Sequence, residues 1–547
     1  MRFATVALVF LVLALATATL WEHQHDEGVT YDIDLAAIEL PRDPALARRA
    51  DLLSAPLFAK PTRGVAEVVD SLRSGSSGQP HPPLFHLVVH GVARAAGANP
   101  YVLRGPALLA GLLTLAGLMR LGDRLGRRAG GAPLGIGFAA ALWLAASPWM
   151  HTITVFLRPY PLALCAAVWS AESLASGLLE PHRKGPWLRL ALCLSAGLYT
   201  LYHFVFVVFA LAVVGLVTAL FGARGSRSLR LRGGLLAHVG ALVLWAPWIP
   251  TFVRHLQTGS GGGLYYMGTV PFADWPARGT LLARRFVYAE ASGPWWPIAI
   301  GLGLFGVLSV WVLLRGERPA RRGLLFGLAV GGLFAFGVAA ADLAGSSHTL
   351  FLSKYSFALY PFVLLASASA WCGTRRPRLG AVATVLGAAL FGAASANQLV
   401  QLNSMTSGPE RIAQHLTDRD REDHLIALST SRRGLLVPLL LEASEAGVRS
   451  ARWCRLDAAE LGGHLANLLN DASLTELTLI DFEAGFLPPG QRFLRPSLER
   501  AMRDALEAGW RVRWYEPNVE APRERGNPEA ERVLHLFRAL PARFFRA

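Results

Sequence analysis

Residues 204–222 read FVFVVFALAVVGLVTALFG and contain no charged side chain. About 20 apolar residues in helical conformation cross the hydrocarbon core of a bilayer. Further apolar blocks of similar length recur along the first 400 residues, at 3–20, 101–119, 132–150, 159–178, 187–202, 234–252, 295–314, 323–345, 355–372 and 379–397. The sequence therefore predicts a polytopic, mainly α-helical membrane protein with about eleven transmembrane helices.

The composition agrees with that prediction. Of 547 residues, 53% are hydrophobic and only 17% are charged, whereas about 25% are charged in a typical soluble chain. The net charge of +15 does not indicate a nucleic-acid partner, because the arginines lie mainly in short loops between apolar blocks. The four cysteines show no CxxC spacing, so neither a disulfide framework nor a zinc site is predicted.

Basic residues occur in every second loop, which sets the expected orientation. The five basic loops are Arg120–Arg128, His182–Arg189, Arg224–Arg232, Arg315–Arg322 and Arg375–Arg378. Cytoplasmic loops are enriched in arginine and lysine. We therefore expect a cytoplasmic N-terminus, with segment 21–100, loop 253–294 and the C-terminal region on the outer side. A bacterial inner membrane, with the periplasm as the outer side, is the expected location.

Two domains are predicted. The first, residues 1–400, holds the transmembrane helices and the outer loop 21–100, in which His81–Gly97 is interpreted as an interfacial helix because it is short and contains three histidines. The second, residues 401–547, is expected to be a small soluble α/β domain on the periplasmic side. Its expected elements are strands at 425–429, 477–482 and 511–515 and helices near 433–445, 457–470 and 494–508.

Candidate chemistry lies in the segments expected outside the membrane. Asp26 and Glu27 form a carboxylate pair soon after the first span. The pair is either part of a solvated acidic segment or a catalytic general base. Arg158 and Lys354 lie at outer helix ends, where they could anchor to headgroups or grip a phosphate. His86 and His90 have i, i+4 spacing but no third ligand nearby, so packing is favoured over a metal site.

Several short motifs, taken in order, resemble the GT-C glycosyltransferases, and more narrowly the branch of protein O-mannosyltransferases and lipid A aminoarabinose transferases. The resemblance covers roughly residues 1–400. Its motifs are Asp26-Glu27, His81-Pro82-Pro83-Leu84, Arg104, Arg158-Pro159-Tyr160, Tyr202-His203-Phe204 and Lys354-Tyr355 followed by Pro361.

The resemblance implies a transferase that moves a sugar from a polyprenyl-phosphate donor to a lipid, glycan or protein hydroxyl at the outer face, with inversion. Asp26 would be the general base and Glu27 would orient nearby groups. The implied substrate- and phosphate-binding residues are His81, Arg104, Arg158, Tyr160, His203, Lys354 and Tyr355. No cofactor or metal site is predicted, and a divalent metal requirement is left open.

Two positions depart from the pattern of this branch. Phe156 stands where an acidic residue is common, two positions before Arg158, and Lys354 stands where an arginine is more usual. Lysine binds phosphate as a point charge, without the two-pronged geometry of arginine. The alternatives are a non-catalytic relative that binds polyprenyl lipid or scaffolds an envelope assembly, and a transporter, for which Glu172 and Asp342 are the ionisable residues within spans.

Overall fold

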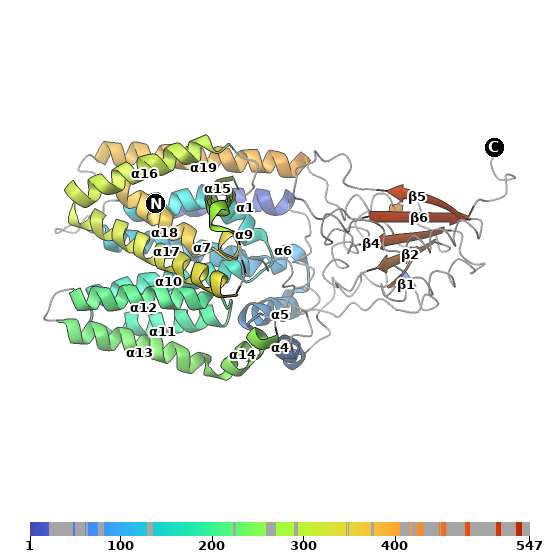
Figure 1. The fold of residues 1–547 in the computed structure, drawn as a ribbon, viewed down its shortest axis with the longest axis horizontal. Coiled ribbons are helices and arrows are strands. Elements are labelled where there is room, and N and C mark those ends of the chain that lie inside the picture. The colour runs from blue at the N-terminus through green and yellow to red at the C-terminus, as the bar shows by residue number, and fades with distance from the viewer. Residues whose placement is uncertain are drawn as a thin grey trace. The chain divides into compact units, whose positions relative to one another are not determined.

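The computed structural model of the chain describes residues 1–20, 48–49, 61, 64–74, 81–127, 135–221, 226–258, 270–288, 294–345, 347, 349–372, 377–404, 416–417, 424–429, 448, 450–455, 476–481, 510–515 and 532–538. Two compact units are formed, a helical one that ends at residue 404 and a second one that contains the strands. Figure 1 labels the elements of both.

Long helices lie side by side in the helical unit (Figure 1). The helices are α1 (Arg2–Leu20), α4 (Val65–Ser74), α5 (Leu84–Ala96), α6 (Pro100–Leu103), α7 (Gly105–Leu125), α8 (Ile136–Ala146), α9 (Pro148–Val155), α10 (Tyr160–Leu179), α11 (Lys184–Leu198), α12 (Phe204–Phe221), α13 (Arg227–Trp245), α14 (Ile249–Thr258), α15 (Trp275–Tyr288), α16 (Trp296–Arg315), α17 (Arg318–Gly345), α18 (Leu359–Cys372) and α19 (Pro377–Ser404). Three short 3-10 helices are η3 (Ala246–Trp248), η5 (Phe272–Asp274) and η6 (Thr349–Phe351).

Within the described residues, eight helices are long and apolar enough to cross a membrane, or nine when the bent pair α8 and α9 counts as one span. The chain is thus a multi-pass helical membrane protein. Each of the eleven predicted blocks contains a helix, but α11 and α18 have only 15 and 14 residues. Helix α11 ends at Leu198, where a turn begins, and α18 begins at Leu359, after a turn. Both helices are therefore shorter than the predicted blocks. The helix predicted within 81–97 is present as α5, with 13 residues.

A sharp bend of 64° separates α8 from α9. Pro148 lacks a backbone N–H and its ring clashes with the preceding turn, so the helix breaks and the carbonyl groups of Ala145 and Ala146 lose helical partners. Side chains replace those partners: a ring nitrogen of His151 lies 2.6 Å from the Ala145 carbonyl, and Ser395 donates to the Ala146 carbonyl at 2.7 Å. The bend therefore survives among apolar helices, where unsatisfied backbone groups are costly.

Helices α7 and α8 approach each other closely at Gly122 and Gly137. A Cβ atom added at Gly137 would lie 2.0 Å from the Met119 carbonyl oxygen, and one at Gly122 would lie 2.5 Å from the Cα of Gly137. Small residues at such crossings allow two backbones to touch, a common packing mode of membrane helices. This contact fixes α7 against the bent pair.

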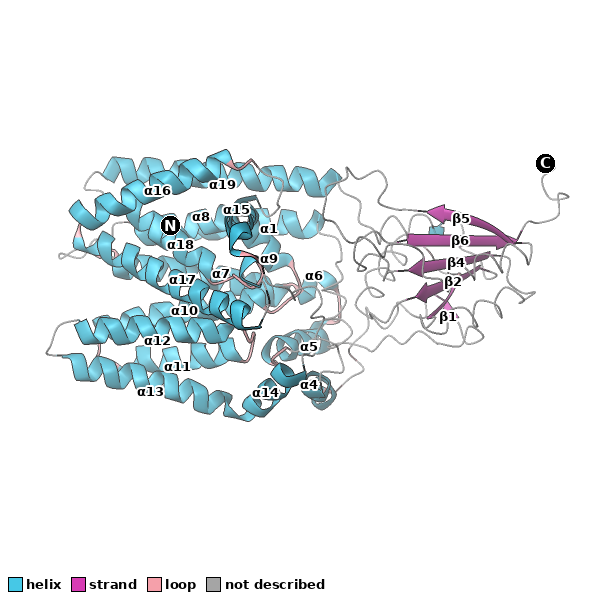
Figure 2. Cartoon of the chain, viewed as in Figure 1, coloured by secondary structure: helices cyan, strands magenta, loops and turns pink. Residues whose placement is uncertain are grey.

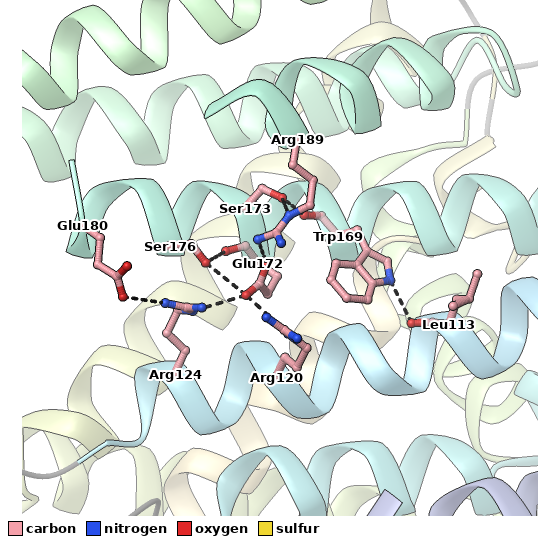
Figure 3. Close-up of polar contacts among 9 residues, drawn as sticks. All are labelled: Leu113, Arg120, Arg124, Trp169, Glu172, Ser173, Ser176, Glu180 and Arg189. Atoms are coloured by element: carbon pink, nitrogen blue, oxygen red, sulfur yellow. Dashed lines mark hydrogen bonds and ion pairs between the residues drawn. The ribbon is translucent and has the colours of Figure 1, made fainter. Parts of the chain in front are cut away.

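Helices α7, α10 and α11 are joined by ion pairs around Glu172 of α10 (Figure 3). The carboxylate is fully buried and is bonded by Arg124 of α7, at 3.2 Å, and by Arg189 of α11. Arg124 also bridges to Glu180, at 3.2 Å. Because both oxygens of Glu172 meet guanidinium groups, the charge is compensated although water is excluded.

The second unit contains a six-stranded sheet, drawn in magenta in Figure 2. Its strands are β1 (Arg48–Arg49), β2 (His424–Ser429), β3 (Arg452–Arg455), β4 (Glu476–Asp481), β5 (Trp510–Tyr515) and β6 (Arg532–Arg538), in the order β1-β3-β2-β4-β6-β5. Pairs β2–β3 and β2–β4 are parallel, and the others are antiparallel. Strands β2, β4 and β5 lie at the three predicted positions, whereas the three predicted helices fall outside the described residues.

Substitution of Gly137 by alanine is expected to destabilise the helical unit, because its Cβ cannot fit against the Met119 carbonyl without moving a backbone. Overpacking of this kind costs about 1–3 kcal/mol. The measurement is the Tm of the purified protein in detergent. Gly301→Ala is the matched control, since nothing lies within 4 Å of a Cβ there. Equal Tm values for the two variants would contradict the close contact.

Glu172→Gln should lower the free energy of unfolding by about 3 kcal/mol, because it leaves Arg124 and Arg189 without their buried counter-charge. Glu180→Gln should change it little, because Glu180 is 38% exposed and such pairs contribute little. Thermal unfolding of both variants in the same detergent compares them directly. A larger loss for Glu180→Gln would show that Glu172 does not organise the cluster.

Candidate active site

The N-terminus of α7 meets the C-terminal end of α1 through Arg104. This side chain is 3% exposed, and its Nη1 donates to the Ala18 carbonyl at 3.3 Å. The last carbonyls of a helix carry partial negative charge, so a cation is favoured there. Arg104 therefore lies where the chain leaves the first span.

Arg158 and Tyr160 come from the break between α9 and α10. Phe156 ends α9 in extended conformation, and the Arg158 N–H donates to the Phe156 carbonyl at 2.7 Å. Pro159 then starts α10 with its fixed φ angle. The Arg158 side chain is 2% exposed and Tyr160 is fully buried. A cation and a phenol thus lie two residues apart at one helix end.

His203 belongs to the turn between α11 and α12. The neighbouring Tyr202 holds this turn, since its hydroxyl accepts a hydrogen bond from Trp248 Nε1 at 3.0 Å and lies 2.8 Å from His255 Nδ1. The same region is tied to α5, because the Leu84 N–H donates to the Tyr199 carbonyl at 2.9 Å.

Lys354 and Tyr355 lie in the segment between α17 and α18, which is held by a buried carboxylate. Asp342 accepts hydrogen bonds from Ser347 Oγ at 2.6 Å, Thr349 Oγ1 at 2.7 Å and the Leu350 N–H at 2.7 Å. Sequence reasoning noticed Asp342 only as an ionisable residue within a span. A usable signal was its place one turn before the hydroxyl-rich run Ser346-Ser347-His348-Thr349.

Three predicted site residues from three separate segments meet in space. The His203 and Tyr355 rings are stacked with centroids 4.5 Å apart, and the Tyr160 ring meets Tyr355 edge-on at 6.1 Å. Lys354 Nζ lies 5.6 Å from the Tyr355 ring centroid. Together Tyr160, His203, Lys354 and Tyr355 form the aromatic–cation cluster, with Arg158 two residues from it along the chain.

His81 precedes α5 in the chain. It is buried, and its ring centroid is 5.9 Å from that of His86. Asp26 and Glu27 lie outside the described residues. Within the part of the chain that the structure describes, no group of three or more His, Cys, Asp or Glu side chains is arranged to hold a metal ion.

Withdrawal of the His203 ring from water, beneath Tyr355, lowers its pKa to about 4, and the negative charge of Asp342 opposes this shift. His203 is therefore neutral at pH 7. A neutral imidazole both donates and accepts hydrogen bonds, which suits contact with sugar hydroxyl groups.

No protein-family model and no curated protein sequence matches the chain. Solved structures align with it at low identity. ArnT from Cupriavidus metallidurans in the apo state is 14% identical, with a TM-score of 0.46 over 96% of this chain and 97% of that one. The archaeal oligosaccharyltransferase AglB from Archaeoglobus fulgidus, in complex with an inhibitory peptide and a dolichol-phosphate, is 10% identical, with a TM-score of 0.41 over 87% and 69%. The arabinofuranosyltransferase AftD from Mycobacteria is 14% identical, with a TM-score of 0.40 over 94% and 41%. The case for a function rests on the chain's own residues.

The shifted pKa of His203 gives a pH dependence with a definite sign. In the unfolded chain His203 binds a proton near pH 6.5, whereas in the folded chain it binds one only near pH 4. The free energy of unfolding therefore decreases as pH falls between those values. Tm measured from pH 7.5 to 4.5 should therefore fall more steeply for wild type than for His203→Gln. Parallel curves would mean that His203 is not withdrawn from water.

Proposed function

We propose that this protein is a membrane glycosyltransferase that transfers a sugar from a polyprenyl-phosphate donor to an acceptor hydroxyl, with inversion at the anomeric carbon. The observation that carries the proposal is the aromatic–cation cluster. Rings from three helix junctions meet there beside the Lys354 ammonium group, and the sequence motifs that contain them are among those that resemble GT-C enzymes.

The electrostatics of the cluster suit this reaction. A lipid phosphate is an ionised leaving group, so its departure needs fixed positive charge and no proton donor. Lys354 supplies an ammonium group beside Tyr355. Arg158, almost fully buried, supplies a guanidinium group whose shape matches two phosphate oxygens. Little solvent reorganisation is needed around such a buried cation when charge moves to the leaving group.

The aromatic rings fit the sugar side of the donor. The His203 ring stacks on Tyr355, and the Tyr160 ring lies roughly perpendicular to Tyr355. Rings arranged in this way offer apolar contact for a sugar face, and the neutral His203 offers a hydrogen bond. His81 and Arg104 complete the proposed binding set, Arg104 at the point where the chain leaves α1.

Asp26 is proposed as the general base, with Glu27 orienting it or the acceptor. A carboxylate base takes the acceptor proton as the oxygen attacks the anomeric carbon from the face opposite the lipid phosphate. The C–O bond to the phosphate then breaks, and the electron pair leaves with the phosphate. Arg158 and Lys354 hold that phosphate as its negative charge grows.

The two acidic residues that a transporter would use, Glu172 and Asp342, are engaged in ways that favour an enzyme. Glu172 is held in ion pairs by two arginines, and Asp342 organises a loop through three hydrogen bonds. Coupling residues of transporters must exchange protons or ions near mid-membrane. A non-catalytic lipid-binding relative would keep the phosphate site and lack transfer.

The test is transfer of radiolabelled sugar from a panel of polyprenyl-phosphate sugars by purified protein in lipid, with membrane extract as acceptor. Asp26→Asn should abolish transfer while the protein still folds. Lys354→Met should lower kcat about a hundredfold, as loss of one charge-stabilising group commonly does. Lys184→Met, at an exposed lysine at the start of α11, is the matched control and should retain activity.

Full transfer by Asp26→Asn would show that Asp26 is not the general base. No transfer from any donor by wild type, with polyprenyl phosphate still bound, would identify a binding or scaffolding protein instead.

A further inference from the structure

The arginines around Glu172 outnumber the carboxylates that they contact. Arg124 and Arg189 bond Glu172, Arg120 lies 3.9 Å from it, and Arg183 bonds Glu180 at 3.0 Å. Four arginines therefore share two glutamates, which leaves an excess of positive charge. The group lies at the end of the helical unit where α7 and α10 end and α11 begins. We call this end the basic-loop end.

Arg183, which lies between α10 and α11, is 75% exposed although it bonds Glu180, and the three arginines near Glu172 are less exposed. Arg124, bonded to both glutamates, is 19% exposed, and Arg189, bonded to Glu172 and Ser173, is 35% exposed. Arg120 is 54% exposed, and its 3.9 Å separation from Glu172 is too long for a hydrogen bond. Its guanidinium group is thus presented to the surroundings.

Trp169 holds the guanidinium groups of Arg120 and Arg189 in place. Arg120 and Arg189 lie over its ring, with their central carbons 5.7 and 5.5 Å from the ring centroid. The indole N–H donates to the Leu113 carbonyl at 2.9 Å, which fixes the ring against α7 (Figure 3). Tryptophan with arginine is typical of the level where hydrocarbon meets headgroups.

Exposed leucines continue from this cluster along the same two helices. Leu109 and Leu113 of α7 are exposed, as are Leu188 and Leu192 of α11. Leu113 lies about two helical turns from Arg120, and Leu192 about one turn from Arg189, in each case away from the basic-loop end. Apolar surface therefore lies deeper in the membrane than the exposed cations.

We propose that Arg120 and Arg189, held over Trp169, bind the phosphate of an anionic phospholipid whose acyl chains lie along Leu113 and Leu192. Arginine binds phosphate oxygens in pairs and is weakly hydrated, so it suits this position better than a point charge. A soluble phosphate would use only the cations, whereas a phospholipid also covers the exposed leucines. This site is independent of the proposed sugar transfer.

The test is native mass spectrometry of the full chain in detergent, titrated with dioleoylphosphatidylglycerol or dioleoylphosphatidylcholine. Wild type should bind phosphatidylglycerol more tightly than phosphatidylcholine. Arg120→Ala should weaken phosphatidylglycerol binding about fivefold, the effect expected of one interfacial arginine. Arg127→Ala, at an exposed arginine of the same basic loop, is the matched control and should bind as wild type does.

Three results would overturn the proposal. Equal binding of phosphatidylglycerol by wild type and Arg120→Ala would show that Arg120 does not bind the lipid. Equal weakening by Arg120→Ala and Arg127→Ala would indicate general attraction to a basic surface. Displacement of the lipid by inorganic phosphate at the same concentration would indicate a soluble anion as the ligand.

Discussion

Satisfaction of backbone hydrogen bonds away from water is the constraint on which this structure depends. Among apolar helices each interrupted turn needs a replacement partner, and the chain supplies these from side chains. His151 and Ser395 serve the break between α8 and α9, and Asp342 serves the loop after α17. The aromatic–cation cluster is built from segments that such interruptions release, so its geometry follows from how they are held.

Charge is divided between two levels of the helical unit. At the basic-loop end, Glu172 compensates arginines from neighbouring helices and ties α7, α10 and α11 together. At the opposite helix ends, Arg104 precedes α7, Arg158 precedes α10 and Lys354 precedes α18. A negative charge brought to the basic-loop end would add to existing ion pairs, whereas Lys354 of the aromatic–cation cluster and Arg158 are proposed to bind the donor phosphate.

Sequence patterns predicted the helical class of the protein and the positions of many of its helices and strands. Apolar blocks located a helix in every predicted span, and short apolar runs located β2, β4 and β5. Helix length was harder to predict, because α11 and α18 are shortened by turns whose stability comes from contacts such as Trp248 with Tyr202. Hydropathy does not register contacts between residues so far apart in the chain.

The site was predictable as a set of residues and not as a geometry. Tyr160, His203 and Tyr355 could be chosen from motif order, but their ring contacts depend on how three helix junctions pack. Asp342 was missed in that role because a single aspartate near the end of an apolar block looks the same whether it binds an ion, moves a proton or caps a loop. The ion pairs of Glu172 likewise require the crossing of three helices.

The most direct test of the central claim is photo-crosslinking with a polyprenyl phosphate that carries a photoreactive group in the isoprene unit next to the phosphate. After irradiation of the purified protein in lipid, the labelled peptides are identified by mass spectrometry. The account predicts label within residues 156–160, 199–203 or 352–355, and loss of that label when unmodified polyprenyl phosphate competes. Label confined to residues 120–128 and 182–189 would contradict it.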